Sequence, residues 1–292
     1  MSQSSPRSGL AARGAVDVRA HLSRPRRSLK PLRRDLETRL EALQRDYAEL
    51  HTEVFEAAQV HRRLCAPRLV RRGRFEIASE IFAIRHLPGD FFTVEDTSDG
   101  VLLTLGDICG KGLAAGMWTT HLVSLVGSLA AETSDVAAIV EGVNRQICGN
   151  KSVVPLASLF LAKVDPETGT VEYCSAGHPP ALLLRADGTL ELLSDGGLLL
   201  GVLRSAKYVV GRFELGVGDV LMIYSDGITE SLNSAGEEFG HSRLEAQLRK
   251  SQKGPADGVL FSVLGAVQDF AGACPLVDDM SLAIVRREGF EH

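Results

Sequence analysis

The first regular pattern along the chain is a narrow stripe in which positions are spaced alternately four and three residues apart. Its members are Leu36, Leu40, Leu43, Tyr47, Leu50, Val54, Ala57, His61 and Leu64. This spacing is typical of a heptad seam on one long helix, with His61 as a tolerated polar residue. Because one helix cannot bury so narrow a stripe alone, the pattern predicts a parallel coiled-coil homodimer through residues 36–64. Packing of the stripe on the chain's own domain is the alternative.

Beyond residue 74, short apolar or alternating runs are separated by Gly, Asp and Pro, which is typical of strands. The predicted strands are 75–81, 91–95, 101–105, 157–164, 171–175, 181–185, 189–193, 208–215, 220–224 and 280–285. Helical stretches interrupt them in pairs, at 112–131 with 134–148 and at 241–252 with 256–272. This grouping predicts an α+β fold, a four-layer α-β-β-α sandwich of two antiparallel sheets flanked by helix pairs. A long coiled-coil-like helix precedes it.

The pattern divides the chain into three predicted parts, which are a tail at 1–34, a linker helix at 35–70 and a main domain at 71–288. The tail has no hydrophobic period and a net charge of +8, which predicts a disordered basic segment. A transit peptide, an anchor to an anionic surface and a start codon placed too far upstream are the other interpretations.

Charge and cysteine content narrow the functional classes. The residues after the tail carry a net charge of −13, which argues against binding to a nucleic-acid backbone. The five cysteines show no metal-binding spacing, so we expect free thiols in a reducing compartment and a cytoplasmic protein. We expect no membrane span, because no apolar run approaches the roughly 20 residues that a spanning helix needs.

Acidic residues recur where predicted strands end, beside glycine or a second acid. Asp107 follows the run 101–105, Asp90 and Asp226 lie beside glycines, and Asp278 adjoins Asp279. Each alone is a common surface turn. Together they form an all-oxygen set, which suits Mg²⁺ or Mn²⁺ and disfavours zinc. Two such ions can activate water for phosphoester hydrolysis. That route needs no protein nucleophile, and the sequence contains neither a nucleophile motif nor a P-loop.

Several motifs occur in one order between residues 76 and 286. They are Pro88-Gly89-Asp90-Phe91-Phe92, Gly106-Asp107-Ile108-Cys109-Gly110-Lys111-Gly112, Ala176-Gly177-His178-Pro179-Pro180, Leu199-Leu200-Gly201, Gly218-Asp219-Val220-Leu221, Tyr224-Ser225-Asp226-Gly227-Ile228-Thr229-Glu230, Glu238-Phe239-Gly240 and Asp278-Asp279-Met280-Ser281-Leu282. In this set the chain resembles the metal-dependent protein phosphatase (PPM) family, in its bacterial SpoIIE/RsbU-like branch.

The resemblance implies a protein serine/threonine phosphatase that uses two Mn²⁺ or Mg²⁺ ions. It assigns the metal ligands to Asp90, Asp107, the backbone carbonyl of Ile108, Asp226 and Asp278. Asp107 would bridge both ions and, with Asp226, counts as catalytic. Asp90 and the Ile108 carbonyl would serve one ion, whereas Asp226 and Asp278 would serve the other.

Two points stay open at this level. The order of Asp278 and Asp279 as direct ligand is not decided by the sequence. The family motif usually reads Gly-Gly-Asp-Phe-Tyr-Asp, whereas here Pro88 replaces the first glycine and Thr93 the last acid. Thr93 therefore favours one alternative, a weak or inactive scaffold that binds phosphoproteins.

The resemblance also implies a partner class. The substrate would be a phosphorylated protein in a bacterial signalling pathway, such as a STAS-type anti-sigma-factor antagonist. A further alternative is a two-metal phosphodiesterase or nuclease acting on a small nucleotide. The seam at 36–64 would dimerise the protein and couple it to an upstream partner.

Overall fold

The computed structural model describes residues 30–65, 68–149 and 156–289. They fall into two compact units, residues 1–51 and residues 52–292. Helix α1 (Lys30–Cys65) contains the boundary between the units, and it covers the whole predicted seam. Residues 30–34, which we assigned to the tail, are helical, and residues 1–29 lie outside the described part of the chain. The three-part division of the chain stays a prediction.

The second unit alternates strands with pairs of helices, as the hydrophobic pattern predicts. After α1 its elements are β1 (Leu69–Arg72), β2 (Phe75–Phe82), β3 (Phe91–Thr97), β4 (Gly100–Ile108), α2 (Leu113–Glu132), α3 (Val136–Gly149), β5 (Ala157–Val164), β6 (Thr170–Ala176), β7 (Ala181–Leu184), β8 (Leu190–Leu193), β9 (Gly196–Gly197), β10 (Gly211–Glu214), β11 (Val220–Tyr224), α4 (Asp226–Thr229), α5 (Gly240–Ser251), α6 (Ala256–Ala271) and β12 (Met280–Arg287). Strand β1 lies across position 70/71, where we placed the start of the main domain.

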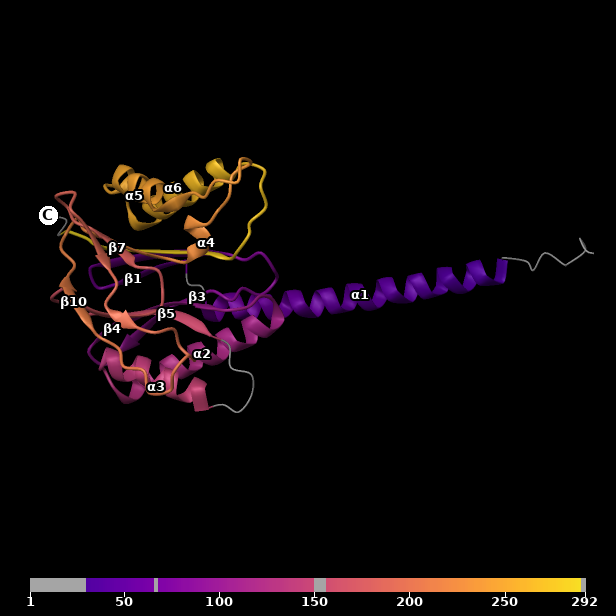
Figure 1. Ribbon diagram of the computed structural model, residues 1–292, viewed down its shortest axis with the longest axis horizontal. Coiled ribbons are helices and arrows are strands. Elements are labelled where there is room, and N and C mark those ends of the chain that lie inside the picture. Colours follow the sequence, from indigo (N-terminus) through magenta and orange to yellow (C-terminus); the bar gives the residue numbers. More distant parts are fainter. Residues whose placement is uncertain (1–29, 66–67, 150–155, 290–292) are drawn as a thin grey trace, which may run out of the picture. The chain divides into compact units, whose positions relative to one another are not determined.

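The strands form two sheets. One has the order β1-β2-β12-β11-β7-β8, and the other has the order β10-β6-β5-β4-β3, with β9 paired to β6. Neighbouring strands are antiparallel except for the short β6–β9 pair, which is parallel. Figure 1 shows the two sheets stacked between α2 and α3 on one side and α5 and α6 on the other. The predicted four-layer α+β sandwich is therefore confirmed.

Three apolar clusters fill the spaces between these layers. The central one lies between the sheets and contains Phe92, Phe160 and Ile223, with rings and branched chains from both inner faces. A second joins α2 and α3 to their sheet, and a third joins α5 and α6 to the other sheet. Residues of β5 and β11 are almost all buried, because these strands have packed layers on both faces.

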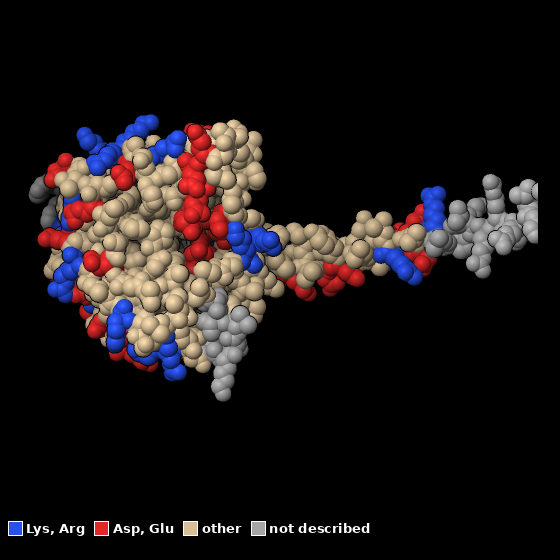
Figure 2. Space-filling model, viewed as in Figure 1, with Lys and Arg blue, Asp and Glu red and all other residues tan. Residues whose placement is uncertain are grey.

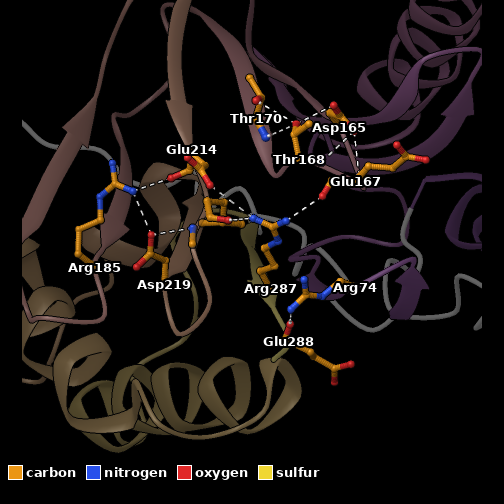
Figure 3. Close-up of polar contacts among 12 residues, drawn as sticks. Arg74, Asp165, Glu167, Thr168, Thr170, Arg185, Glu214, Asp219, Arg287 and Glu288 are labelled. Carbon is orange, nitrogen blue, oxygen red and sulfur yellow. Dashed lines mark hydrogen bonds and ion pairs between the residues drawn. The ribbon is translucent and has the colours of Figure 1, made fainter. Parts of the chain in front are cut away.

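A polar network ties the two sheets together at one end (Figure 3). Arg287, the last residue of β12, donates hydrogen bonds to the carbonyls of Glu167 and Leu215 at 2.9 and 3.3 Å. Nearby, Arg185 contacts Asp219 at 3.0 Å. Because β12 runs from Met280 to Arg287, the contacts of Arg287 lie at the end of the strand opposite to Asp278 and Asp279. The acidic residues therefore lie at the other end of the sandwich.

Helix α2 modifies one expectation from the sequence. By length and composition alone it could cross a membrane, with a mean hydropathy of 1.3, and 28% of that segment is buried. It packs on β3, β4 and α3, and core helices of globular domains pass the same test. The absence of a membrane span stays a prediction.

Candidate metal centre

The strand register brings the acidic residues to one edge of the sandwich. In one sheet, Phe91 of β3 pairs with Gly106 of β4. Asp90 and Asp107 therefore lie next to each other at the same end of these two strands. In the other sheet, Tyr224 pairs with Leu282, so Asp226 follows one strand where Asp278 precedes its neighbour. Within each sheet, antiparallel pairing thus places both carboxylates at the same end, with Asp107 inside the end of β4 and the other three just beyond a strand end.

Asp90 lies deepest in the group. Its residue surface is 2% exposed, and its Oδ2 accepts a 2.5 Å hydrogen bond from the hydroxyl of Ser281. Burial raises the pKa of Asp90 well above its ordinary value, and the charge of Asp107 raises it further. A buried carboxylate of this kind favours a cation beside it, because a cation offsets both effects.

Asp107 is the electrostatic centre of the group. Burial raises its pKa to about 6, and the charges of Asp226, Asp278 and Asp279 add to the rise, whereas a hydrogen bond with Asp90 opposes it. These contributions weaken with distance, so they indicate that carboxylates from both sheets lie close enough to Asp107 to interact with its charge. A divalent cation would relieve this repulsion.

The backbone around Ile108 forms a close-fitting cradle. A Cβ atom added to Gly89 would lie 3.0 Å from the Ile108 carbonyl oxygen and 3.3 Å from Oδ1 of Asp107. The Ile108 N–H also donates to the Gly89 carbonyl at 3.3 Å. Glycine at 89 therefore lets two candidate oxygen ligands stand beside the loop that carries Asp90.

Asp278 and Asp279 have different surroundings, although they are neighbours in the chain. Both oxygens of buried Asp279 accept backbone hydrogen bonds, from Ile84 at 2.8 Å and from Gly89 at 2.8 Å. Asp278 has a side chain that is 43% exposed, and its Oδ2 lies 2.9 Å from Nζ of Lys111. The geometry gives Asp279 a structural task and leaves Asp278 open to the site.

Asp226 begins the short helix α4, with one residue between it and the end of β11. The helix approaches Asp279 so closely that a Cβ on Gly227 would lie 2.0 Å from the Asp279 carbonyl oxygen. Burial raises the pKa of Glu230, with further contributions from the charges of Asp226, Glu238 and Asp278. Figure 2 shows the result as a band of acidic side chains that passes over α4.

A cavity of about 410 Å³ adjoins Asp107 and Asp226. His178 and Ser158 line it, and Oγ of Ser158 lies 2.7 Å from Nδ1 of His178. Burial lowers the pKa of His178 to about 3, so its ring is neutral at neutral pH. Its Nε2 has no hydrogen-bond partner among the residues that the structure describes. A neutral histidine that is held in this way is better suited to positioning than to proton transfer.

The donor set fits a hard divalent cation. Every assigned group is a carboxylate or carbonyl oxygen, and the repulsion at Asp107 has the sign that a cation removes. Within the described ranges, no group of three His, Cys, Asp or Glu side chains lies close enough together to hold a metal ion without rearrangement. The side chains instead make protein contacts, such as Asp90 with Ser281 and Asp278 with Lys111.

Comparison with known families agrees with this geometry. The model of the family described as Stage II sporulation protein E (SpoIIE) matches residues 97–288, about two thirds of the chain. The chain belongs to the SpoIIE family. This confirms the resemblance that the ordered motifs indicate.

Two curated relatives show how far the similarity extends. Phosphoserine phosphatase RsbU of Bacillus subtilis is 24% identical over 244 residues, which cover 82% of this chain and 71% of RsbU. Protein IcfG of Synechocystis is 26% identical over 188 residues, which cover 55% of this chain. The chain spans only 30% of the length of IcfG.

Solved structures confirm the fold. The SiaA-PP2C domain of Pseudomonas aeruginosa superimposes with a TM-score of 0.72 at 17% identity, covering 83% of this chain and 99% of that domain. The catalytic domain of the phosphatase PstP, solved in complex with two manganese ions, gives a TM-score of 0.55 at 15% identity, covering 74% of this chain and 99% of that domain. The fold of this chain is thus that of PP2C phosphatase domains.

Sequence analysis missed two polar contributors to this site. Ser281 lies inside a motif that we quoted, two residues after Asp279, yet its bond to Asp90 was not expected. The pairing of Ser158 with His178 was also missed. A signal for Ser158 exists in the sequence, because it is the one hydroxyl in an otherwise apolar strand start.

Proposed function

We propose that this protein is a metal-dependent serine/threonine protein phosphatase, which hydrolyses phosphoserine and phosphothreonine. The observation that carries the proposal is the meeting of Asp90, Asp107, Asp226 and Asp278 from two sheets at one edge, in a member of the SpoIIE family. In this assignment, Asp90, Asp107, the Ile108 carbonyl, Asp226 and Asp278 hold two Mn²⁺ or Mg²⁺ ions. Such a pair supplies an activated water and neutralises charge on the phosphoryl group.

The chain's own residues have separate tasks in this proposal. Asp107 faces carboxylates from both sheets, so it is the bridging ligand. Ser281 stabilises the ionised form of Asp90 by donating to it, and Asp279 holds the Asp90 loop through the N–H of Gly89. Asp278, which is more exposed than Asp279, is the direct ligand of the pair.

The test is hydrolysis of p-nitrophenyl phosphate and of a phosphoserine peptide with Mn²⁺, Mg²⁺ or EDTA, for the wild type and Asp107→Asn. Turnover that needs metal and is lost in the variant supports the proposal. A folded protein with no turnover on any monoester would instead be a phosphoprotein-binding scaffold, the alternative that Thr93 favours. Turnover restricted to diesters would indicate a nucleotide phosphodiesterase.

For the substrate we propose a phosphorylated STAS-type anti-sigma-factor antagonist in a cytoplasmic bacterial signalling pathway. The similarity to RsbU supports this class, and the acidic band on the face of the domain disfavours nucleic acid. The discriminating assay compares an intact phosphorylated STAS domain with a short peptide around its phosphoserine. A kcat/KM at least tenfold higher for the intact domain is expected, and equal values would contradict this assignment.

The proposal includes a homodimer through residues 36–64. The described helix carries exposed seam residues, among them Leu40, Leu43 and Leu50. His61 departs from the expected pattern, because it is buried against residues 52–289 of its own chain. The dimer contact therefore belongs to the part of the seam before His61.

A further inference from the structure

A cavity separate from the carboxylates lies between the last turns of α1 and the end of β2. Its volume is about 340 Å³, at the small end of the range of about 300–1,000 Å³ that ligand pockets occupy. It is lined by Phe55, Ala58, Gln59, His61, Arg62, Cys65, Ile81, Phe82, Ala83, His86 and Pro88. All of these residues belong to the second compact unit. Arg62, which contacts Glu80 of β2 at 2.8 Å, fixes the helical wall to the sheet.

His61 is the polar group in this wall that requires explanation. It is 4% exposed, and its Nε2 has no hydrogen-bond partner among the described residues. Burial lowers the pKa of His61, so the ring is neutral at neutral pH and offers one N–H and one lone pair. A buried polar atom without a partner is unfavourable, and a ligand that pairs with it recovers that loss.

The other lining residues specify the chemistry of such a ligand. Phe55, Ile81 and Phe82 give the cavity an apolar body with two aromatic walls. Arg62 supplies the positive charge of the lining, neutral His61 supplies a hydrogen-bonding ring, and the described lining contains no Asp or Glu. The charge of Arg62 is shared with Glu80, so the cavity suits one anionic group and not several.

We propose that this cavity binds a small monocarboxylate with an apolar, preferably aromatic, body. The carboxylate pairs with Nε2 of His61 beside Arg62, and the body packs between Phe55 and Phe82. Aromatic side chains favour this packing, because ring-to-ring contacts add to the burial of apolar surface.

The position of the cavity makes it an effector site, and this step rests on the proposed function. Pro88 forms part of the wall, and Gly89 follows it in the chain. The N–H of Gly89 donates to the carboxylate of Asp279, and its carbonyl accepts a hydrogen bond from the hydroxyl of Thr119. Asp90 is the next residue. A ligand that contacts Pro88 therefore presses on the loop that carries a proposed metal ligand, and we expect it to change the Mn²⁺ affinity at least twofold.

The test is isothermal titration calorimetry of the full chain with 4-phenylbutyrate and with 4-phenylbutanol as the matched neutral probe. We expect saturable 1:1 binding of the acid with a Kd on the order of 1 mM or tighter, and binding of the alcohol at least about fivefold weaker. His61→Phe should abolish the preference for the acid. Ala58→Leu should fill the cavity and weaken both probes at least tenfold.

Ala48→Leu is the control, because Ala48 lies on the same helix but outside the cavity and the predicted seam. Absence of saturable binding, equal affinity for acid and alcohol, or unchanged binding in folded Ala58→Leu would each overturn the site. Binding with an unchanged Mn²⁺ Kd would overturn the effector role alone. Calorimetry with the probes needs no catalysis, so failure of the phosphatase proposal would be seen separately.

Discussion

Ser281 of β12 donates a 2.5 Å hydrogen bond to Oδ2 of Asp90, and this bond joins the two sheets at the proposed metal centre. Both residues are buried, and the bond opposes the rise in the pKa of Asp90 that burial causes. A single hydroxyl therefore helps to keep a deeply placed carboxylate ionised. Its neighbours in the chain, Asp278 and Asp279, belong to the same strand end.

Removal of this hydroxyl should weaken metal binding. Ser281→Ala is expected to raise the Kd for Mn²⁺ at pH 7 about tenfold, because a hydrogen bond to a charged group contributes about 1.5–3 kcal/mol. Ser281→Thr introduces the residue that the family resemblance gives as usual, and it keeps the hydroxyl. Its Kd for Mn²⁺ should therefore stay within about threefold of the wild-type value. Calorimetric titration with Mn²⁺ measures both, and an unchanged Kd in the alanine variant would contradict the role.

Substitution by asparagine should change the metal-free stability differently at the neighbours Asp278 and Asp279. Asp279→Asn replaces an oxygen that accepts a backbone N–H with an amide group, so the loop from Ile84 to Gly89 loses one anchor. We expect a loss of about 2 kcal/mol in the free energy of unfolding without metal. Asp278→Asn removes an exposed ion pair with Lys111 and keeps an Oδ1 that can accept the N–H of Asp279, so its metal-free stability should stay close to that of the wild type.

Metal binding reverses that ranking. Asp278→Asn should lose most of the rise in Tm that Mn²⁺ gives, because a direct ligand oxygen is missing. Asp279→Asn should keep part of that rise. Thermal unfolding with EDTA and with Mn²⁺ provides all four values, and equal behaviour of the two variants would show that the assignment of direct ligand is wrong.

Asp107 gives a prediction for pH. Its pKa is raised from 3.8 to about 6, chiefly by burial and then by the charges of Asp226, Asp278 and Asp279. A raised folded pKa means that its contribution to stability is complete below pH about 4 and is lost as pH rises through about 6. Without metal, Asp107→Asn should therefore gain stability relative to the wild type as pH rises from 4 to 7. The gain is at most about 3 kcal/mol, from about two pKa units.

The difference between variant and wild type is the quantity to measure, because other groups titrate in the same range. The pKa of Asp90 is raised and acts in the same direction, whereas that of His178 is lowered to about 3 and acts in the opposite one. Urea unfolding in EDTA at several pH values measures that difference, which contains the titration of Asp107 and its coupling to Asp90, whereas His178 is common to both proteins. A difference that does not change with pH would contradict the raised pKa.

Much of the fold follows from local pattern. The bounds of β5 and β11 agree with the predicted runs 157–164 and 220–224, because these strands are mostly apolar and end at turns. The predicted strand 208–215 is shorter in the structure, where β10 covers Gly211–Glu214. Its apolar start at Tyr208 packs on another cluster, beside α3, and is not part of the ladder.

The candidate site was predictable in position but not in detail. Acids at strand ends indicate one edge, yet the sequence cannot tell Asp278 from Asp279. That distinction depends on Ile84 and Gly89, which are almost two hundred positions away. The position of His61 could not be predicted for a similar reason. The heptad pattern placed it on a dimer seam, but long-range packing buried it against its own domain.

The seam before His61 gives the last prediction, which concerns mass. Leu43 is 65% exposed and Leu50 is 58% exposed on α1, one heptad apart. Neither is covered by the described part of the chain, so both are accessible to a second copy. Leu43→Asp with Leu50→Asp places two buried charges in a coiled-coil core, which should dissociate the dimer and halve the mass in size-exclusion chromatography with light scattering. Gln44→Asp lies off the seam of the same helix and should keep the dimer mass. A mass unchanged by the double substitution, or a monomeric wild type, would show that the stripe does not dimerise.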